Sequence, residues 1–333
     1  MQYATNTRLL AGVLLCGLIL AGCAATPQSR ALQRTPPPEL AASVELEQTP
    51  FFPQTRYQCG PAALATVLAT HDIEVTPDAL TERLYVPALH GSLLQEITAT
   101  ARHYGMLAYP LQPSLEDLLT EVAHNNPVLV FQNLGLKWLP RWHYAVVVGY
   151  RLEDDAIILR SGTTRRWRTT LPTFERTWAR GDYWAQVIIP AGRIPATAQL
   201  ARYLQAAHDL ESSAQQAAAH DAFAAATRRW PDAALAWMAF GNNRYAAADH
   251  AAAEQAFRRA TRLSPDDPDG WNNLAYALLQ TGCPQQARNA ARCAVALSPD
   301  STAYRDTLAE ISAGASGRDA QHCQATACSV TAD

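Results

Sequence analysis

The chain has 333 residues, of which 48% are hydrophobic and 17% charged, an ordinary globular composition whose length suggests two folded domains. Its formal net charge of −3 does not favour nucleic-acid binding, and no basic stretch interleaved with aromatic residues is present. The motifs G-x4-G-K-[ST] and H-E-x-x-H, typical of nucleotide and zinc sites, are missing, so we expect no cofactor and no metal ion.

Residues 1–22 predict a signal segment. Arg8 precedes an apolar run over residues 9–20, which is too short to span a bilayer because a spanning helix needs about 20 residues. The string Leu20-Ala21-Gly22-Cys23 resembles the lipobox of bacterial lipoproteins, which implies that Cys23 is the lipidation site. The residue after it, Ala24, implies an outer-membrane location facing the periplasm. An ordinary secretory signal with a chance cysteine is the alternative.

Residues 23–48 are rich in Pro, Ala, Thr and Gln and include Pro36-Pro37-Pro38. Such a composition predicts a tether without a core of its own. We expect it to join the membrane-anchored Cys23 to the first folded domain.

Residues 49–192 predict an α+β domain, since helical patterns come first and β-rich runs follow. Helices are expected over residues 61–69, 93–104 and 114–124, the last beginning with the capping signal Ser114-Leu115-Glu116-Asp117. Strands are expected over residues 128–132, 144–150, 156–159 and 184–189, with a further one over 167–171.

Three residues of this domain indicate nucleophilic catalysis. Cys59 begins a helix-forming run, and a helix N-terminus or a neighbouring imidazolium lowers the pKa of a thiol, which is otherwise about 8.5. His143 begins an apolar strand and could serve as the base. Gln54 and the backbone N–H of Cys59 could donate hydrogen bonds to an oxyanion. Taken singly, each residue is more often structural; their conjunction favours chemistry.

The motifs around these residues resemble the bacteriocin-leader peptidase family, papain-like cysteine peptidases that cut after double-glycine leaders. The matching strings are Gln54-x4-Cys59-Gly60-Pro61, Gly91-Ser92-Leu93, Ala101-x2-Tyr104-Gly105 and His143-Tyr144-x-Val146-Val147. The resemblance covers residues 50 to about 165 and implies a papain-like fold. It also implies that Cys59 is the nucleophile, His143 the general base and Gln54 the oxyanion donor.

One position departs from that family. An aspartate usually ends the strand after the histidine strand, whereas Ser161 stands there in this chain. A carboxylate would orient the imidazole and stabilise its cation. A serine hydroxyl can accept the Nδ1 proton and fix the tautomer, but it carries no charge. Either Ser161 orients His143, or another group does, or the domain no longer cleaves; Asp154 and Asp155 are expected to be solvated.

The second half contains an internal repeat over residues 200–314. Pro231, Pro265 and Pro299 are spaced by 34 residues, as are Tyr203, Trp237 and Trp271. This period resembles the tetratricopeptide repeat and predicts an all-α solenoid with units at about 203–236, 237–270 and 271–304 plus a capping helix. Such arrays bind peptides or partner proteins. The polar residues Asn242, Arg244 and Asn273 either line the binding groove or are solvated.

The C-terminal residues 315–333 are expected to be disordered. The sequence has seven cysteines; Cys16 leaves with the signal, and four others can pair in an exported compartment with three possible connectivities: Cys283, Cys293, Cys323 and Cys328. A metal site made of His322, Cys323 and Cys328 is a weaker interpretation than a local disulfide.

The sequence supports three hypotheses. The first is a lipid-anchored cysteine peptidase, or a related acyl transferase, whose repeats recruit a peptide or protein substrate or a partner. The second is a peptidase-like module that binds peptides without cleaving them, motivated by Ser161. The third is a scaffold in which Cys59 forms a disulfide.

Overall fold

The computed structural model describes residues 26–54, 58–86, 91–314 and 318–328. The predicted signal segment and the lipidation site Cys23 lie outside the described residues. The chain forms two compact units, the first built mainly from residues up to 189 and the second mainly from residue 198 onward. Among the helices of the described ranges, none is long and apolar enough to cross a bilayer.

An antiparallel sheet forms the centre of the first unit, with the strand order β2-β7-β3-β4-β5-β6 and β1 paired to β4. The strands are β1 Ser43–Glu45, β2 Met106–Pro110, β3 Val128–Asn133, β4 Trp142–Arg151, β5 Ala156–Ser161, β6 Thr164–Thr170 and β7 Ala185–Pro190. Residues 144–150 of β4 are buried on both faces, as their nearly continuous apolar run requires.

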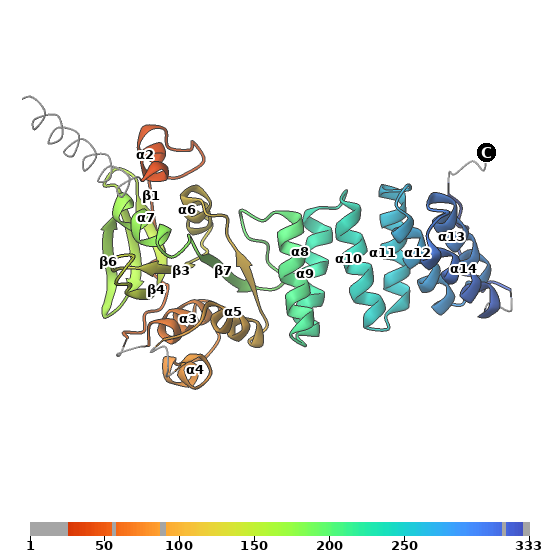
Figure 1. Ribbon diagram of the computed structural model, residues 1–333, viewed down its shortest axis with the longest axis horizontal. Coiled ribbons are helices and arrows are strands. Elements are labelled where there is room, and N and C mark those ends of the chain that lie inside the picture. The colour runs from red at the N-terminus through yellow and green to blue at the C-terminus, as the bar shows by residue number, and fades with distance from the viewer. Residues whose placement is uncertain (1–25, 55–57, 87–90, 315–317, 329–333) are drawn as a thin grey trace, which may run out of the picture. The chain divides into compact units, whose positions relative to one another are not determined.

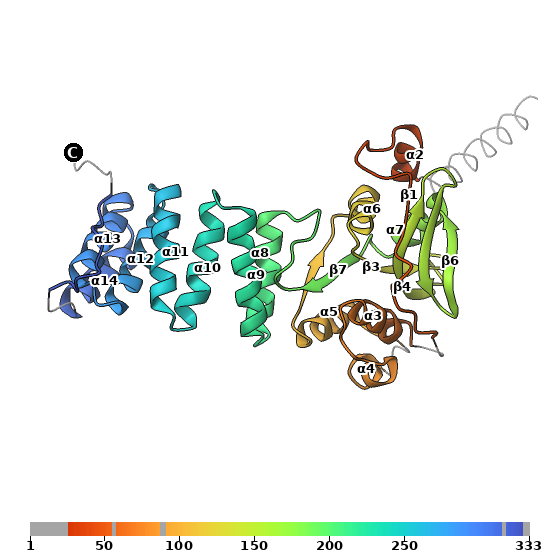
Figure 2. The same ribbon diagram turned by 180° about the vertical axis from the view of Figure 1, so that it is seen from behind.

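Helices cover both faces of this sheet (Figures 1 and 2). They are α2 Pro27–Arg34, α3 Cys59–Ala69, α4 Pro77–Leu84, α5 Leu94–His103, α6 Leu115–Ala123 and α7 Leu171–Ala179. Helices α3, α4 and α5 lie on one side, and α2, α6 and α7 on the other. The α+β architecture is confirmed, although the sequence analysis did not predict α4, α7 or β2.

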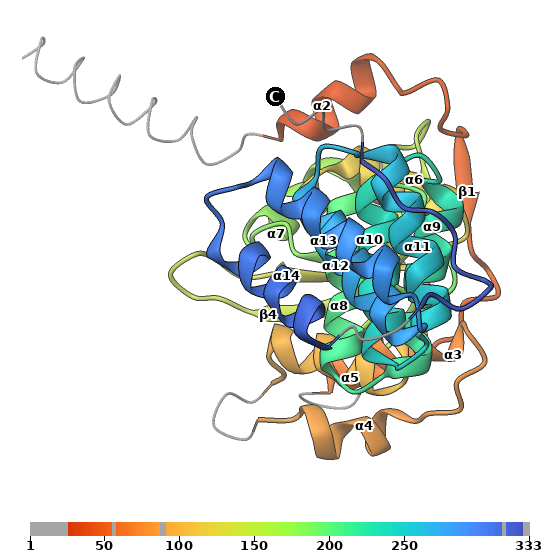
Figure 3. The same ribbon diagram turned by 90° about the vertical axis from the view of Figure 1, so that its right-hand side faces the viewer.

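Residues 26–48 are not a free tether, contrary to the expectation. The chain forms α2 and then runs into β1 (Figure 3). Strand β1 pairs with β4 and so belongs to the sheet. The backbone N–H and hydroxyl of Ser29 donate to the Glu175 carboxylate at 2.7 and 2.5 Å, and both residues are buried. The polar composition suggested solvent contact, but the partner lies 146 residues away in the sequence.

Seven helices in the second unit repeat with the predicted period. They are α8 Leu200–Ser212, α9 Gln216–Arg229, α10 Ala234–Ala246, α11 His250–Leu263, α12 Pro268–Gln280, α13 Pro284–Leu297 and α14 Thr302–Gly314. Alternate helices start at residues 200, 234, 268 and 302, which are 34 apart. The three pairs followed by α14 therefore form a tetratricopeptide array.

Two contacts explain why the repeat needs its characteristic residues. The indole N–H of Trp237 donates to the carbonyl of Pro231, and that of Trp271 donates to Pro265, each at 2.8 Å. Gly241 lies so close to Phe257 that an added Cβ would approach the ring to 2.5 Å. The glycine therefore lets the two helices of one unit pack closely.

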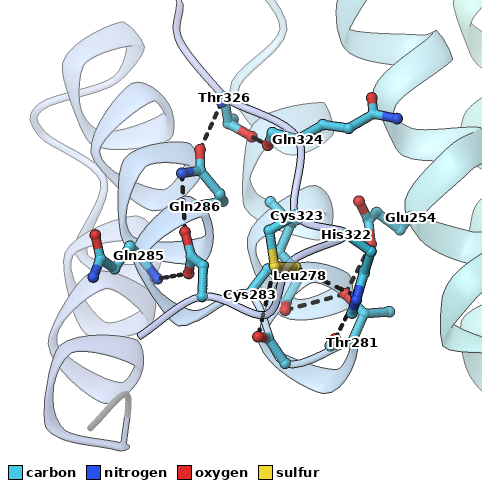
Figure 4. The surroundings of a disulfide bond; sticks show 12 residues. Glu254, Leu278, Thr281, Cys283, Gln285, Gln286, His322, Cys323, Gln324 and Thr326 are labelled. Atoms are coloured by element: carbon cyan, nitrogen blue, oxygen red, sulfur yellow. Dashed lines mark hydrogen bonds between the residues drawn. A yellow bond between two sulfur atoms is a disulfide. The ribbon is translucent and has the colours of Figure 1, made fainter. Parts of the chain in front are cut away.

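Part of the expected C-terminal tail is ordered. Cys283 pairs with Cys323 and Cys293 with Cys328, which fixes the connectivity that the sequence left open. Figure 4 shows the first disulfide with Thr281 and His322 beside it. Because both sulfurs are bonded to each other, they are not available as thiolate ligands for a metal ion. The expectation of disorder is thus wrong for residues 318–328.

The disulfides predict a measurable stability effect. Replacing Cys323 and Cys328 by serine opens two cross-links with sequence separations of 40 and 35 residues, so the free energy of unfolding of the second unit should fall by about 2–4 kcal/mol for each disulfide lost. Chemical denaturation under oxidising conditions measures it, with Cys59→Ser, which removes the free thiol, as the control. Equal stability of the double variant and the wild type would contradict the assignment.

Candidate active site

Cys59 is the first residue of α3, a helix that is almost completely buried in the domain. All residues from Gly60 to Leu68 are buried, and α3 packs against β4. An added Cβ at Gly60 would lie 2.6 Å from the Ser92 hydroxyl, so this position leaves no room for a side chain. Cys59 is half-buried and its thiol is free. The scaffold hypothesis, which paired Cys59 in a disulfide, is therefore wrong.

The thiol of Cys59 lies against the strand that carries His143. Burial raises the pKa of Cys59, and hydrogen bonds from the backbone N–H groups of Tyr144, Gly60 and Cys59 itself partly offset this rise. Tyr144 directly follows His143 on β4. The fold thus brings the cysteine and the histidine strand together, although they are 84 positions apart in the sequence.

His143 and Ser161 form a direct contact across β4 and β5. The His143 Nε2 atom lies 2.8 Å from the Ser161 hydroxyl oxygen. In the tautomer that carries its proton on Nε2, the ring donates to Ser161 and keeps a lone pair on Nδ1. Ser161 thus contacts the His143 ring through Nε2, and not through Nδ1 as the sequence analysis expected, while its role as orienting residue stays a prediction.

The electrostatics of the site favour uncharged side chains. Burial lowers the pKa of His143 to about 4, and the nearby positive charge of Arg141 adds to this effect. Asp154 is engaged with Arg151 and Arg168 at 2.9 and 3.0 Å at the protein surface. Within the described residues, no hydrogen bond joins the Cys59 thiol directly to the His143 ring. Burial therefore favours the neutral form of the Cys59 thiol and of the His143 imidazole.

Gln54 is attached to the same end of the sheet as Ser161. Its backbone N–H donates to the Gly162 carbonyl at 3.0 Å, and Gly162 follows Ser161 in the chain. Residues 55–57, between Gln54 and the cysteine helix, lie outside the described residues. The structure thus places the backbone of Gln54 near the histidine partner, while its role as oxyanion donor stays a prediction.

Arg160 holds the segment that leads to Gln54, a role that the sequence analysis missed. Only 4% of this residue is exposed, and its guanidinium donates to the backbone carbonyls of Leu46, Glu47 and Thr49 at 3.2–3.3 Å. An arginine in an apolar strand is the signal that could have indicated a buried anchor, because a buried charge requires several partners.

A cavity of about 360 Å³ opens beside Cys59. Its walls are mainly apolar, and they are formed by Cys59, Gly91, Ser92, Leu93, Leu94, Gln95, Phe131, Trp142 and Tyr144. Phe131 and Trp142 stack with ring centroids 5.1 Å apart, and the Tyr144 hydroxyl donates to the Ser92 carbonyl at 3.1 Å. The sequence analysis did not identify Phe131 or Trp142, because they meet only when β3 pairs with β4.

A charged partner at position 161 should change the titration of His143. In Ser161→Asp, a carboxylate next to Nε2 stabilises the imidazolium, so the pKa of His143 should rise from about 4 by roughly 1–3 units. Titration by NMR of the ring protons measures this rise, and the exposed His124 provides an internal reference. An unshifted His143 in the variant, or a wild-type value near 6.5, would contradict the assigned geometry.

Two models of protein families match the chain. Residues 46–184 match the model of the Peptidase C39 like family, and residues 256–289 match a tetratricopeptide repeat model. The chain thus carries a C39-like peptidase domain followed by tetratricopeptide repeats. No match was found among curated proteins.

Solved structures resemble each unit separately. A C39-like peptidase from Bacillus anthracis is 17% identical, covers 45% of this chain and 98% of its own, and superposes with a TM-score of 0.38. The peptidase domain of Streptococcus ComA, a bifunctional ABC transporter, is 21% identical over 43% of this chain and 99% of its own, with a TM-score of 0.35. The Yersinia enterocolitica type III secretion chaperone SycD, bound to a peptide of the translocator YopD, is 18% identical over 34% of this chain and 88% of its own, with a TM-score of 0.31.

Proposed function

We propose that this C39-like domain is a cysteine peptidase that hydrolyses peptide bonds in peptide or protein substrates. The observation that carries the proposal is the placement of the Cys59 thiol against the backbone of β4, the strand that also carries His143, whose Nε2 contacts Ser161. The family match over residues 46–184 supports the same chemistry.

The residues suggest a stepwise reaction. As substrate displaces water, the Cys59 proton moves to Nδ1 of His143 and the sulfur attacks the scissile carbonyl carbon. The backbone N–H of Cys59 and the side chain of Gln54 stabilise the oxyanion. The imidazolium then gives its proton to the leaving amine, which leaves a thioester. Water activated by His143 hydrolyses that thioester and restores the thiol.

The cavity beside Cys59 supports a preference for large apolar side chains. Its aromatic walls would bury a leucine or phenylalanine side chain next to the scissile bond, and this burial contributes about 1.5–3 kcal/mol per side chain. A double glycine, the cleavage signal that the family resemblance implied, would leave the cavity unfilled. We therefore expect substrates other than double-glycine leaders.

Lipidation at Cys23 would place this activity at the cell envelope, on the outer membrane and facing the periplasm. The four cysteines that form disulfides fit an oxidising compartment. The tetratricopeptide repeats would bind a protein partner or deliver a protein substrate. Asn273 donates to Asn242 at 3.0 Å, which links α10 to α12 along the helices that such a partner would contact.

A peptide-binding module without catalysis is the second candidate. It is favoured by the uncharged Ser161 and by burial, which holds both Cys59 and His143 in their neutral forms. In this case the cavity would bind an apolar side chain, and no bond would be cut.

Cleavage assays separate the two candidates. Wild-type protein should cut peptides that contain leucine or phenylalanine faster than matched peptides with glycine pairs. Cys59→Ala should lose at least about 10³-fold in kcat/KM while its binding of the peptide is unchanged, because the nucleophile is lost and the cavity remains. Equal cleavage by both proteins would remove Cys59 from the mechanism. Binding without cleavage by the wild type would favour the second candidate.

The pH dependence of cleavage follows from the burial of His143. The base must be unprotonated, and the pKa of this ring is about 4. Activity should therefore persist below pH 6 and decline only as the pH falls towards 4. The profile of kcat/KM against pH measures the decline, and half-maximal activity near pH 6.5 would show that His143 is not buried in this way.

A further inference from the structure

The loop between β3 and β4 exposes a cluster of large apolar side chains. Of the eight exposed large hydrophobic residues in the described part of the chain, five lie within residues 134–142. Their exposed fractions are 46% for Leu134, 53% for Leu136, 78% for Trp138, 60% for Leu139 and 52% for Trp142. Isolated exposed apolar residues are common, but such a cluster marks an interaction surface.

Hydrogen bonds hold this loop in a defined conformation. The Asn133 side-chain oxygen accepts from the backbone N–H groups of Gly135 and Arg141, each at 2.9 Å. Leu136 and Leu139 form two backbone hydrogen bonds with each other, at 3.1 and 3.2 Å. The apolar side chains are therefore presented outward by a rigid hairpin.

The charges of the loop are all positive. Lys137 and Arg141 lie among the apolar residues, and residues 133–142 contain no aspartate or glutamate. Arg180 adds a third positive charge at the base of the loop, where it donates to the Asn133 carbonyl. Exposed tryptophan and leucine next to basic residues match an anionic lipid surface, where the apolar groups enter the interface and the cations meet phosphates.

The loop and the N-terminal segment are attached to the same short helix. Glu175 of α7 binds Ser29 of α2, and Arg180 at the end of α7 binds the base of the loop. The two attachment points are five residues apart, which is about 8 Å along a helix. The predicted lipidation site, Cys23, precedes Thr26, the first described residue, by three positions in the sequence.

We propose that Leu136, Trp138 and Leu139 insert into the interface of an anionic membrane and orient the domain on it. A peptide substrate is a weaker explanation, because Trp142 lines the cavity beside Cys59 but Leu136, Trp138 and Leu139 do not. The proposal is independent of the peptidase activity, and the proposed lipid at Cys23 would act together with the loop, since stable anchoring requires two signals.

Vesicle sedimentation without the lipid anchor tests the loop alone. The chain lacking residues 1–22 and carrying Cys23→Ser is mixed with phosphatidylglycerol-containing vesicles or with phosphatidylcholine vesicles. This protein should bind phosphatidylglycerol-containing vesicles more strongly than phosphatidylcholine vesicles, and added salt should weaken its binding to the anionic vesicles. The triple variant Leu136→Ser, Trp138→Ser, Leu139→Ser should bind at least about tenfold more weakly.

Two further variants keep this test decisive. Trp167→Ser removes a tryptophan of β6 that is similarly exposed at 51% but lies outside the loop, and it should bind like the wild type. Lys137→Glu should weaken binding to anionic vesicles only. No binding by the unsubstituted chain, or equal binding by the triple variant, would overturn the proposal. If the triple variant binds vesicles as the unsubstituted chain does but cleaves soluble peptides more slowly, the loop contacts the substrate and not the membrane.

Discussion

The candidate site depends on the packing of the α3 N-terminus against β4. All residues of α3 from Gly60 to Leu68 are buried. The first residue of the helix, Cys59, therefore has a fixed position. The packing places the Cys59 thiol at the backbone N–H of Tyr144, the residue that follows His143 on β4. It also closes one wall of the apolar cavity. Any change that moves α3 would therefore move the Cys59 thiol relative to β4 and alter the cavity at once.

The same burial determines the charge state of the site. A buried thiol and a buried imidazole both favour their neutral forms, because desolvation penalises charge. An aspartate at position 161 would oppose this tendency for the ring, whereas Ser161 orients the ring without supplying charge. In the proposed mechanism, the proton would therefore move from Cys59 to His143 only when a substrate is bound. This would limit reaction of the thiol with other electrophiles.

Local sequence patterns predicted the elements that carry the chemistry but not the long-range contacts around them. The apolar run after Cys59 and the strand after His143 are visible in the sequence because their periodicity is local. The bond between Ser29 and Glu175 joins positions 146 residues apart, so α2 was mistaken for a tether. Arg160 was missed for the same reason, since its partners lie in a segment more than 100 residues earlier. The cavity wall depends on the register of β3 and β4, which composition alone does not determine.

Alkylation of the Cys59 thiol by iodoacetamide as a function of pH tests the charge state most directly, since only the thiolate reacts appreciably. Cys59 is the free cysteine of the described chain, and mass spectrometry can follow it individually. A buried, neutral Cys59 thiol should be alkylated slowly at neutral pH, at a rate that rises with a single apparent pKa above the ordinary thiol value of about 8.5. A fast, constant rate between about pH 5 and 8 would reveal a preformed thiolate–imidazolium pair and contradict the account.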